Sequence, residues 1–228
     1  MHMTKLSNFL VLFLVLNLSS YSQNFLSTSG TSIVNENGDT IIFRGMGLGG
    51  WMVQEGYMMA PGGFSSTQYQ IKDRLIELIG EEETDVFYNN WLSNHVRKID
   101  IDSMKQWGFN LIRVPIHYNL FTEPIENEPF PNAYTEKEIG FTLLDSLLSW
   151  CKQNQIYLMI DLHAAPGGQG YNADISDYDP TKPSLWESTL NQNKTVELWR
   201  RLASRYKNEE WIAGYDLINE PNWDIPGG

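Results

Sequence analysis

The chain has 228 residues, of which 42% are hydrophobic, 13% aromatic and 19% charged. This composition is typical of a globular protein with a sizeable core, and it excludes a disordered or low-complexity chain. The 28 acidic residues outnumber the 16 basic ones and give a net charge of −12. Because an acidic protein repels phosphate groups, we expect neither nucleic acid nor an anionic membrane surface as a partner, and a neutral substrate suits the charge.

The first 22 residues have the pattern of a signal peptide. A lysine precedes an apolar run at 9–18, and Ser20 and Ser22 place small residues at the −3 and −1 positions before Gln23. The run is too short for a membrane-spanning helix, which needs roughly 20 residues. The alternative is a buried N-terminal helix. We therefore expect cleavage between Ser22 and Gln23 and a secreted protein, extracellular or periplasmic.

Strand and helix patterns alternate along the rest of the chain. An Asn37-Gly38 turn between two β-branched runs predicts an N-terminal β-hairpin of residues 31–34 and 40–43. Apolar runs predict core strands at 41–46, 109–115, 156–162 and 212–218. Spacings of three and four residues predict helices at 65–80 (with Ser65-Ser66 as the N-cap), 82–107 (broken near Ser93), 138–153 and 195–206. This alternation favours an α/β fold with a parallel sheet buried on both faces.

Polar side chains gather at the predicted strand ends, where parallel sheets carry their functional sites. Asp161 and His163 end the third core strand, Asn219 and Glu220 follow the fourth, and Arg113 lies within the second. Glu220 is expected to be half shielded from water, which would raise its pKa toward the value a general acid needs. The alternatives are a surface glutamate, a structural histidine and a structural salt bridge of the arginine.

Four segments in order, 42–51 (IFRGMGLGGW), 108–115 (GFNLIRVP), 161–163 (DLH) and 218–221 (INEP), resemble glycoside hydrolase family 5. The family belongs to a clan of retaining (β/α)8 glycosidases, and the turn after the third strand is most similar to the exo-β-1,3-glucanase branch. The resemblance implies a TIM (β/α)8 barrel of which the chain holds the first four βα units. We therefore expect residues 23–228 to be the N-terminal half of a catalytic domain, inactive when isolated.

The resemblance also implies a role for seven residues. Glu220 matches the general acid/base. The other six match positions that contact the sugar or its surroundings: Asn219 at the 2-hydroxyl, His163 in the −1 subsite, Arg113 beside the nucleophile, His117, Tyr118 and Trp51. For Trp51, core packing is an equally expected role. The family's nucleophile is a glutamate that ends the seventh strand, so it is expected outside this chain, and no cofactor or metal is expected.

The expected activity is that of a secreted retaining β-glycosidase that hydrolyses a β-glucan-type polysaccharide. The alternative is a non-catalytic carbohydrate-binding relative with the same fold. β-1,3-Glucan, β-1,4-glucan and mannan stay open as substrates, as do endo or exo action and the oligomeric state.

Three further signals are given structural interpretations. Gly45-x-Gly47-x-x-Gly50 fits a dinucleotide-binding fingerprint, but residues 51–63 have a loop pattern where that motif needs a helix. The acidic segment 172–179 lacks EF-hand spacing, so a solvated loop is favoured over a calcium site. Cys151, the single cysteine, lies on a leucine stripe and is expected in the core.

Overall fold

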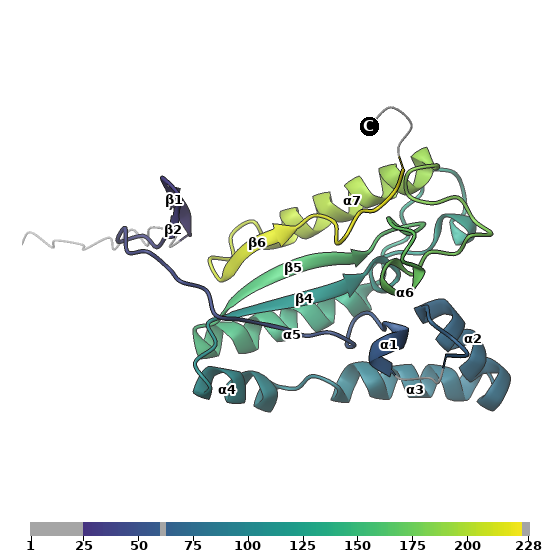
Figure 1. The fold of residues 1–228 in the computed structure, drawn as a ribbon, viewed down its shortest axis with the longest axis horizontal. Coiled ribbons are helices and arrows are strands. Elements are labelled where there is room, and N and C mark those ends of the chain that lie inside the picture. Colours follow the sequence, from purple (N-terminus) through teal and green to yellow (C-terminus); the bar gives the residue numbers. More distant parts are fainter. Residues whose placement is uncertain (1–24, 60–62, 225–228) are drawn as a thin grey trace, which may run out of the picture.

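A computed structural model describes residues 25–59 and 63–224 of the chain, so the predicted signal peptide lies outside the described residues. Its centre is a four-stranded parallel sheet in the order β3-β4-β5-β6 (Figure 1). The strands are β3 (Gly45–Gly47), β4 (Leu111–His117), β5 (Tyr157–Ala164) and β6 (Ile212–Asp216). The predicted α/β class is confirmed. Among the described residues no helix has the length and hydropathy needed to cross a membrane.

Helices connect each strand to the next. Four lie between β3 and β4: α1 (Gly56–Met59), α2 (Gln68–Ile79), α3 (Glu81–Asn94) and α4 (Lys98–Gln106). The 3₁₀ turns η1 (Tyr118–Leu120) and η2 (Ile125–Asn127) and helix α5 (Glu138–Asn154) link β4 to β5, and α6 (Ala173–Ser176) and α7 (Thr189–Tyr206) link β5 to β6. Figure 1 shows α5 and α7 running alongside the sheet, as crossover helices between parallel strands do.

Successive side chains of β5 point alternately to the apolar core and to the polar site. Leu158, Ile160 and Leu162 are fully buried and belong to one apolar cluster with the inner faces of α5 and α7. Burying each such side chain contributes about 1.5–3 kcal/mol. Asp161 and His163 fall on the opposite face because successive strand residues point to opposite sides. The same strand thus anchors the helices and carries polar groups toward its carboxyl end.

The N-terminal pairing differs from the predicted hairpin. β1 (Ser27–Ser29) pairs antiparallel with β2 (Ser32–Val34), and Thr40 contributes only an isolated bridge to Val34. The next segment is held by a side chain instead of a strand ladder, because Asn110 donates to the Ile42 carbonyl (2.9 Å) and accepts from the Arg44 amide (2.6 Å). The first core strand therefore begins at Gly45 and not at residue 41.

Two helix starts also differ from the prediction. α2 is capped by Thr67, whose hydroxyl accepts from the Gln70 amide, and not by Ser65 or Ser66. α7 begins at Thr189, and not at residue 195, because the Ser188 hydroxyl caps the helix by accepting from the Asn191 amide at 3.3 Å. The prediction rested on the apolar stripe, which starts later in the helix than this cap. The predicted break near Ser93 is confirmed, since α3 ends at Asn94 and α4 begins at Lys98.

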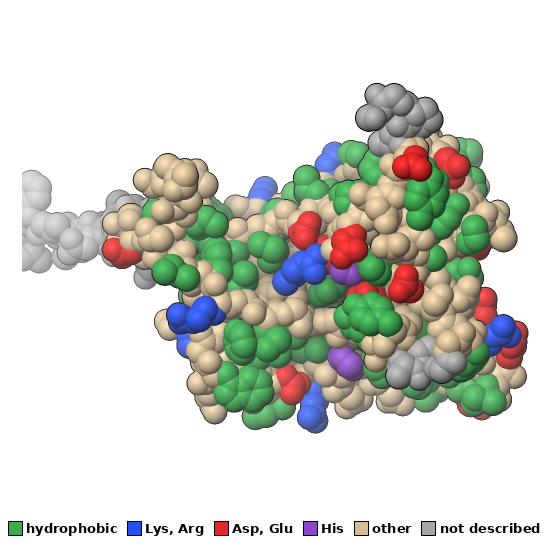
Figure 2. All heavy atoms as spheres, in the orientation of Figure 1, with side chains coloured by type: hydrophobic (Ala, Val, Ile, Leu, Met, Phe, Trp, Pro, Cys, Tyr) green, Lys and Arg blue, Asp and Glu red, His purple; other side chains and the backbone are tan. Residues whose placement is uncertain are grey.

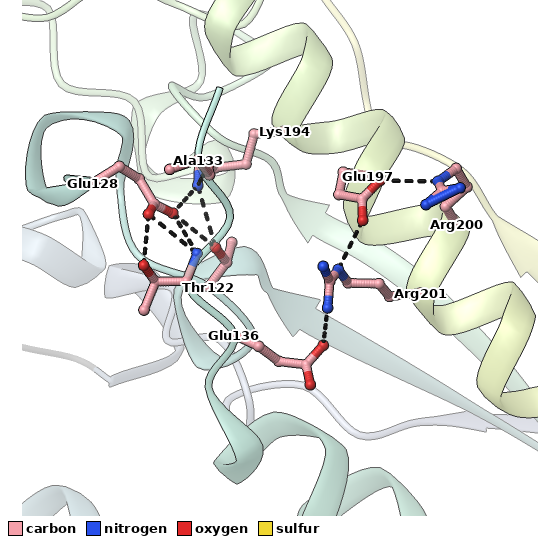
Figure 3. Close-up of polar contacts among 9 residues, drawn as sticks. Thr122, Glu128, Ala133, Glu136, Lys194, Glu197, Arg200 and Arg201 are labelled. Carbon is pink, nitrogen blue, oxygen red and sulfur yellow. Dashed lines mark hydrogen bonds and ion pairs between the residues drawn. The ribbon is translucent and has the colours of Figure 1, made fainter. Parts of the chain in front are cut away.

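The long connection between β4 and α5 is fastened to α7 by a buried ion pair. Lys194 of α7 bonds the Glu128 carboxylate, the Thr122 hydroxyl (3.2 Å) and the Ala133 carbonyl (3.3 Å) (Figure 3). Both charged side chains are only 3% exposed. Thr135 also donates to Glu128 through its amide (2.9 Å) and its hydroxyl (2.7 Å), but Lys194 supplies the opposite charge that a buried carboxylate needs.

Removing the lysine should therefore be strongly destabilising. We expect Lys194→Ala to lower the free energy of unfolding of the full-length protein by about 3–5 kcal/mol, since the buried Glu128 carboxylate would lose its ion-pair partner and keep only the neutral donors of Thr122 and Thr135. Urea unfolding monitored by circular dichroism measures the change. Arg74→Ala, which breaks the exposed Arg74–Glu77 pair (2.7 Å), is the matched control and should cost less than about 1 kcal/mol. Equal losses in the two variants would contradict the role assigned to the pair.

Candidate active site

The polar residues predicted at the strand ends meet at one edge of the sheet. Arg113 comes from β4, Asp161 and His163 from β5, and Asn219 and Glu220 from the segment after β6. All four strands run in the same direction, so their carboxyl ends share that edge. Figure 2 shows acidic and basic side chains and a histidine close together near the middle of the face in view.

Arg113 ties the strands together through one nitrogen. Its Nη2 lies 2.9 Å from Asp161 Oδ2, 3.0 Å from Asp216 Oδ2 and 2.8 Å from Asn219 Oδ1. Asp161 is fully buried, and a buried carboxylate needs such a cationic partner. Because Asn219 accepts through its oxygen, its amide group is the part left to donate to a substrate.

His163 lies between two buried carboxylates. Its Nδ1 is 2.7 Å from Asp161 Oδ2, and its Nε2 is 3.2 Å from Glu55 Oε1 and 3.3 Å from Asn219 Nδ2. Burial alone would lower the pKa of His163, but the hydrogen bonds and charges of Asp161 and Glu55 outweigh it and raise the pKa to about 9. At neutral pH the ring is therefore an imidazolium that is hydrogen-bonded to Asp161 and ion-paired with Glu55.

Gln169 fixes the two loops that carry these groups. Its side-chain amide donates to the carbonyls of His163 (2.7 Å) and Asn219 (2.8 Å), and its oxygen accepts from the Ala165 amide (3.1 Å). The backbone N–H of Asn219 in turn donates to the Leu162 carbonyl at 3.0 Å. The backbone on both sides of the site is therefore held by hydrogen bonds, which limits how far the polar side chains can shift.

Glu220 differs from the prediction in its surroundings. It is exposed, not half shielded, and its backbone is left-handed with φ 43°. That conformation is costly for a residue with a β-carbon and persists only where neighbours impose it. Here Asn222 fixes the segment by bridging to Gly170 and accepting from the Tyr171 amide (2.7 Å). Strain held in place at a carboxylate is typical of functional positions.

Glu55 and Gln169 are members of the site to which the sequence analysis assigned no role. Glu55 is buried, and its Oε1 lies 3.2 Å from His163 Nε2 as an ion pair. It follows β3 by several loop residues, so strand periodicity does not predict its direction. The only sequence signal was its position after the first strand, which it shares with polar residues after the other strands.

Three predicted sugar-binding residues lie outside this cluster. Trp51 is 2% exposed and its indole donates to the Leu92 carbonyl (2.8 Å), so it packs in the core and is not a stacking platform. His117 is also buried, with Nε2 2.9 Å from Asp177 Oδ2 and Nδ1 accepting from the Asn119 amide. Tyr118 stacks on His117, and both line a separate cavity of about 520 Å³. A sugar contact by His117 or Tyr118 stays a prediction.

The acidic segment after β5 is partly structural. Asp177, at φ 53°, accepts from the Tyr69 amide (2.9 Å) as well as binding His117, so it joins this loop to α2 and β4. Among the described residues, no group of three or more His, Cys, Asp or Glu side chains is arranged to hold a metal ion.

The sequence matches Cellulase (glycosyl hydrolase family 5) over residues 71–226. The chain belongs to glycosyl hydrolase family 5. It is 36% identical over 198 residues to a beta-xylosidase of Phanerodontia chrysosporium, covering 86% of this chain and 39% of that protein. It is 32% identical over 189 residues to a probable glucan 1,3-beta-glucosidase A of Aspergillus niger, covering 82% of this chain and 42% of that protein. The chain thus spans about two fifths of the length of these relatives.

A solved structure shares the fold of this family 5 chain. The rutinosidase of Aspergillus niger aligns with a TM-score of 0.60 at 18% identity, over 78% of this chain and 49% of that one. At this identity the likeness concerns the fold alone. It supports the arrangement of strands and helices around the site, and the chemistry must be argued from the side chains.

The raised pKa of His163 predicts a pH-dependent stability. The folded state binds the proton more tightly than the unfolded chain, whose value is 6.5. The resulting stabilisation is complete below pH 6.5 and is lost as the pH rises to about 9. We expect the free energy of unfolding of the full-length protein to fall over this interval in the wild type and less steeply in His163→Gln. Parallel curves for the two proteins would refute the ion-paired imidazolium.

Proposed function

We propose that the chain is the N-terminal half of the (β/α)8 catalytic domain of a secreted retaining β-glycosidase acting on β-glucan-type polysaccharides. The observation that carries this proposal is the placement of Asn219 and Glu220 beside the Arg113–Asp161–His163 ion pairs. The exposed Glu220 carboxylate is accessible to substrate and its backbone is held in place, which meets the requirement that a general acid/base reach the glycosidic oxygen.

The half-barrel arrangement is supported by the sheet itself. Its four strands are parallel and neighbour one another in chain order, each joined to the next by helical segments. That is the repeating unit of a (β/α)8 barrel, in which active sites occupy the carboxyl ends of the strands. We place the nucleophile on the part of the barrel that the longer relatives have beyond this chain.

In the proposed reaction Glu220 works twice. It first protonates the glycosidic oxygen while the nucleophile attacks the anomeric carbon, so the leaving sugar departs as an alcohol and a glycosyl-enzyme forms. Glu220, now ionised, then removes a proton from water, which attacks the anomeric carbon and releases the nucleophile. A retaining site needs the two carboxylates about 5–5.5 Å apart. The Asn219 amide group, left free to donate, would bind the 2-hydroxyl of the same sugar.

Buried Glu55 supports a neutral, hydroxyl-rich ligand. A carboxylate that is ion-paired through one oxygen with His163 has remaining lone pairs, and a pair of adjacent sugar hydroxyls can donate to them. Glucosides and xylosides, named for the two relatives above, share equatorial hydroxyls at C2 and C3. Mannosides have an axial 2-hydroxyl, which would lie away from the amide group of Asn219. We therefore favour β-glucans over mannan.

The alternative is a carbohydrate-binding relative without catalysis. It would keep Asn219, His163 and Glu55 because they bind sugar, but it would have no use for a strained, exposed carboxylate at 220. The presence of Glu220 in that conformation favours the enzyme. Turnover of aryl β-glycosides by the full-length protein discriminates the two.

The first test concerns the role of Glu220. In the full-length enzyme, Glu220→Ala should lose at least about 100-fold in rate on substrates with poor leaving groups, because general acid catalysis contributes about 10²–10⁴-fold. Formation of the glycosyl-enzyme from dinitrophenyl glycosides should fall far less, since that leaving group needs no proton. Added azide should then accelerate release of the glycosyl intermediate, because an anion needs no general base. Equal losses on both substrate types without azide rescue would make Glu220 structural.

The second test concerns the substrate. Reducing-sugar release by the full-length enzyme from β-1,3-glucan, β-1,4-glucan, xylan and mannan should be highest on a glucan, for the stereochemical reason above. Asn219→Asp, which keeps the size but removes the donating amide group, should reduce kcat/KM on the preferred substrate by about tenfold or more. Hydrolysis of mannan but of neither glucan would reject the preference for a glucan.

A further inference from the structure

The segment that carries Glu220 continues from the end of β6 as irregular backbone. At Glu220 this backbone is left-handed, with φ 43°. Pro221 follows directly, and a proline favours an extended backbone in the residue before it. The conformation of Glu220 therefore conflicts both with its own β-carbon and with its neighbour, so contacts with another part of the chain must hold it.

On the upstream side, the loop after β5 holds the peptide bond that joins Asn219 to Glu220. The carbonyl of this peptide bond accepts from the Gln169 side chain at 2.8 Å. Gln169 is fully buried, and its own carbonyl accepts from the Trp186 indole at 2.9 Å, so it has little freedom to move. One end of the Glu220 backbone is therefore fixed to the loop after β5.

On the downstream side, Asn222 fixes the chain two residues after Glu220. Its side-chain Oδ1 accepts from the Tyr171 amide at 2.7 Å, and its backbone forms a parallel bridge to Gly170. Only Pro221 lies between Asn222 and Glu220, and the proline ring fixes its own φ. A shift of Asn222 is therefore passed on to the Glu220 backbone.

Gly170 leaves the room that the Asn222 side chain occupies. A β-carbon at Gly170 would lie 2.3 Å from Asn222 Oδ1, a distance that real β-carbons do not show, and 3.2 Å from the Glu220 carbonyl oxygen. Gly170 is buried and its φ is not left-handed, so the missing side chain serves this close approach and not a special backbone angle. The position of Asn222 thus depends on a residue for which alanine is too large.

The Glu220 side chain gives its carboxylate no support of its own. It is exposed and makes no hydrogen bond or ion pair within the described residues, so the backbone determines where the side chain starts. Correct placement matters because a displacement of about 1 Å at a reacting group can cost about 100-fold in rate.

We propose that Asn222, seated against Gly170, is a positioning residue that holds the Glu220 backbone where its carboxylate can protonate the glycosidic oxygen. The inference rests on the proposed function and adds to that site two residues that act on the general acid/base through its backbone. The Asn222 side chain and the loop after β5 would then control the proton transfer without contacting the sugar.

The test compares kcat/KM of full-length variants on two aryl β-glucosides. A phenyl leaving group needs a proton from the general acid, whereas a dinitrophenyl group does not, so a displaced Glu220 slows only the first reaction. The variants are Asn222→Ala, Gly170→Ala and the double variant, which complete a double-mutant cycle. Asn90→Ala is the matched control, since Asn90 is an exposed residue of α3 whose side chain makes no hydrogen bond within the described residues.

We expect Asn222→Ala to lower kcat/KM about tenfold or more on the phenyl glucoside and less than about threefold on the dinitrophenyl glucoside. Gly170→Ala should have the same selective effect, because its β-carbon would displace the Asn222 side chain. In the Asn222→Ala background, Gly170→Ala should change kcat/KM less than about twofold, because the atom that it displaces is gone. Asn90→Ala should match the wild type on both substrates.

A second measurement needs no turnover. The Tyr171 amide donates to Asn222 Oδ1, and the Asn219 amide donates to the Leu162 carbonyl, so both are protected from hydrogen exchange while the segment is held. Exchange at both amides should be faster in Asn222→Ala than in the wild type, and unchanged in Asn90→Ala.

Three results would overturn the inference. The first is an Asn222→Ala protein that loses the same activity on both substrates, or none on either. The second is a full additional loss when Gly170→Ala is made in the Asn222→Ala background, and the third is unchanged exchange at the Asn219 amide. A wild type that hydrolyses no glycoside would reject the proposed catalysis, while the exchange rates would still decide whether Asn222 holds the Glu220 backbone.

Discussion

The site depends on a carboxylate that has no access to water. Asp161 is fully buried near the end of β5. Its Oδ2 lies 2.9 Å from Arg113 Nη2 and 2.7 Å from His163 Nδ1, whereas its Oδ1 has no hydrogen-bond partner among the described residues. A buried charge of this kind is tolerated only beside opposite charges with good geometry. The buried charge of Asp161 therefore fixes the positions of Arg113 and His163. Each of these cations also binds a second carboxylate, Asp216 for Arg113 and Glu55 for His163.

The constraint extends across the sheet as alternating charges. From Asp216 on β6 the order is Asp216, Arg113, Asp161, His163 and Glu55, so each cation lies between two carboxylates. Strands β4, β5 and β6 are thus tied at their carboxyl ends by the ion pairs of Arg113 in addition to the backbone ladder. Such a framework reduces the motion of the groups around Glu220, and preorganised groups of this type are worth more to catalysis than mobile ones.

Sequence reasoning predicted the parts of the fold and the site that follow from strand periodicity. Arg113 and His163 lie within strands, so their position along the chain fixes their face of the sheet. Glu55 and Gln169 were not assigned because they lie on loops, whose direction depends on contacts distant in sequence. Of the two roles expected for Trp51, the structure has core packing and not sugar stacking. Trp51 also follows its strand on a turn, and there its indole donates to the Leu92 carbonyl in the core.

The two forms of His163 link this framework to the substrate-binding groups. As an imidazolium it is ion-paired through Nε2 with Glu55, and Asn219 Nδ2, at 3.3 Å from the same nitrogen, is then free to donate elsewhere. As a neutral ring with its proton on Nδ1, it would accept from Asn219 and leave Glu55 without its ion-pair partner. Asn219 cannot avoid this by rotating its amide, because Arg113 binds its oxygen at 2.8 Å. The charge of His163 therefore decides whether the Asn219 amide group is available to a sugar hydroxyl, and the carboxylates on both sides of His163 keep that charge in place at neutral pH.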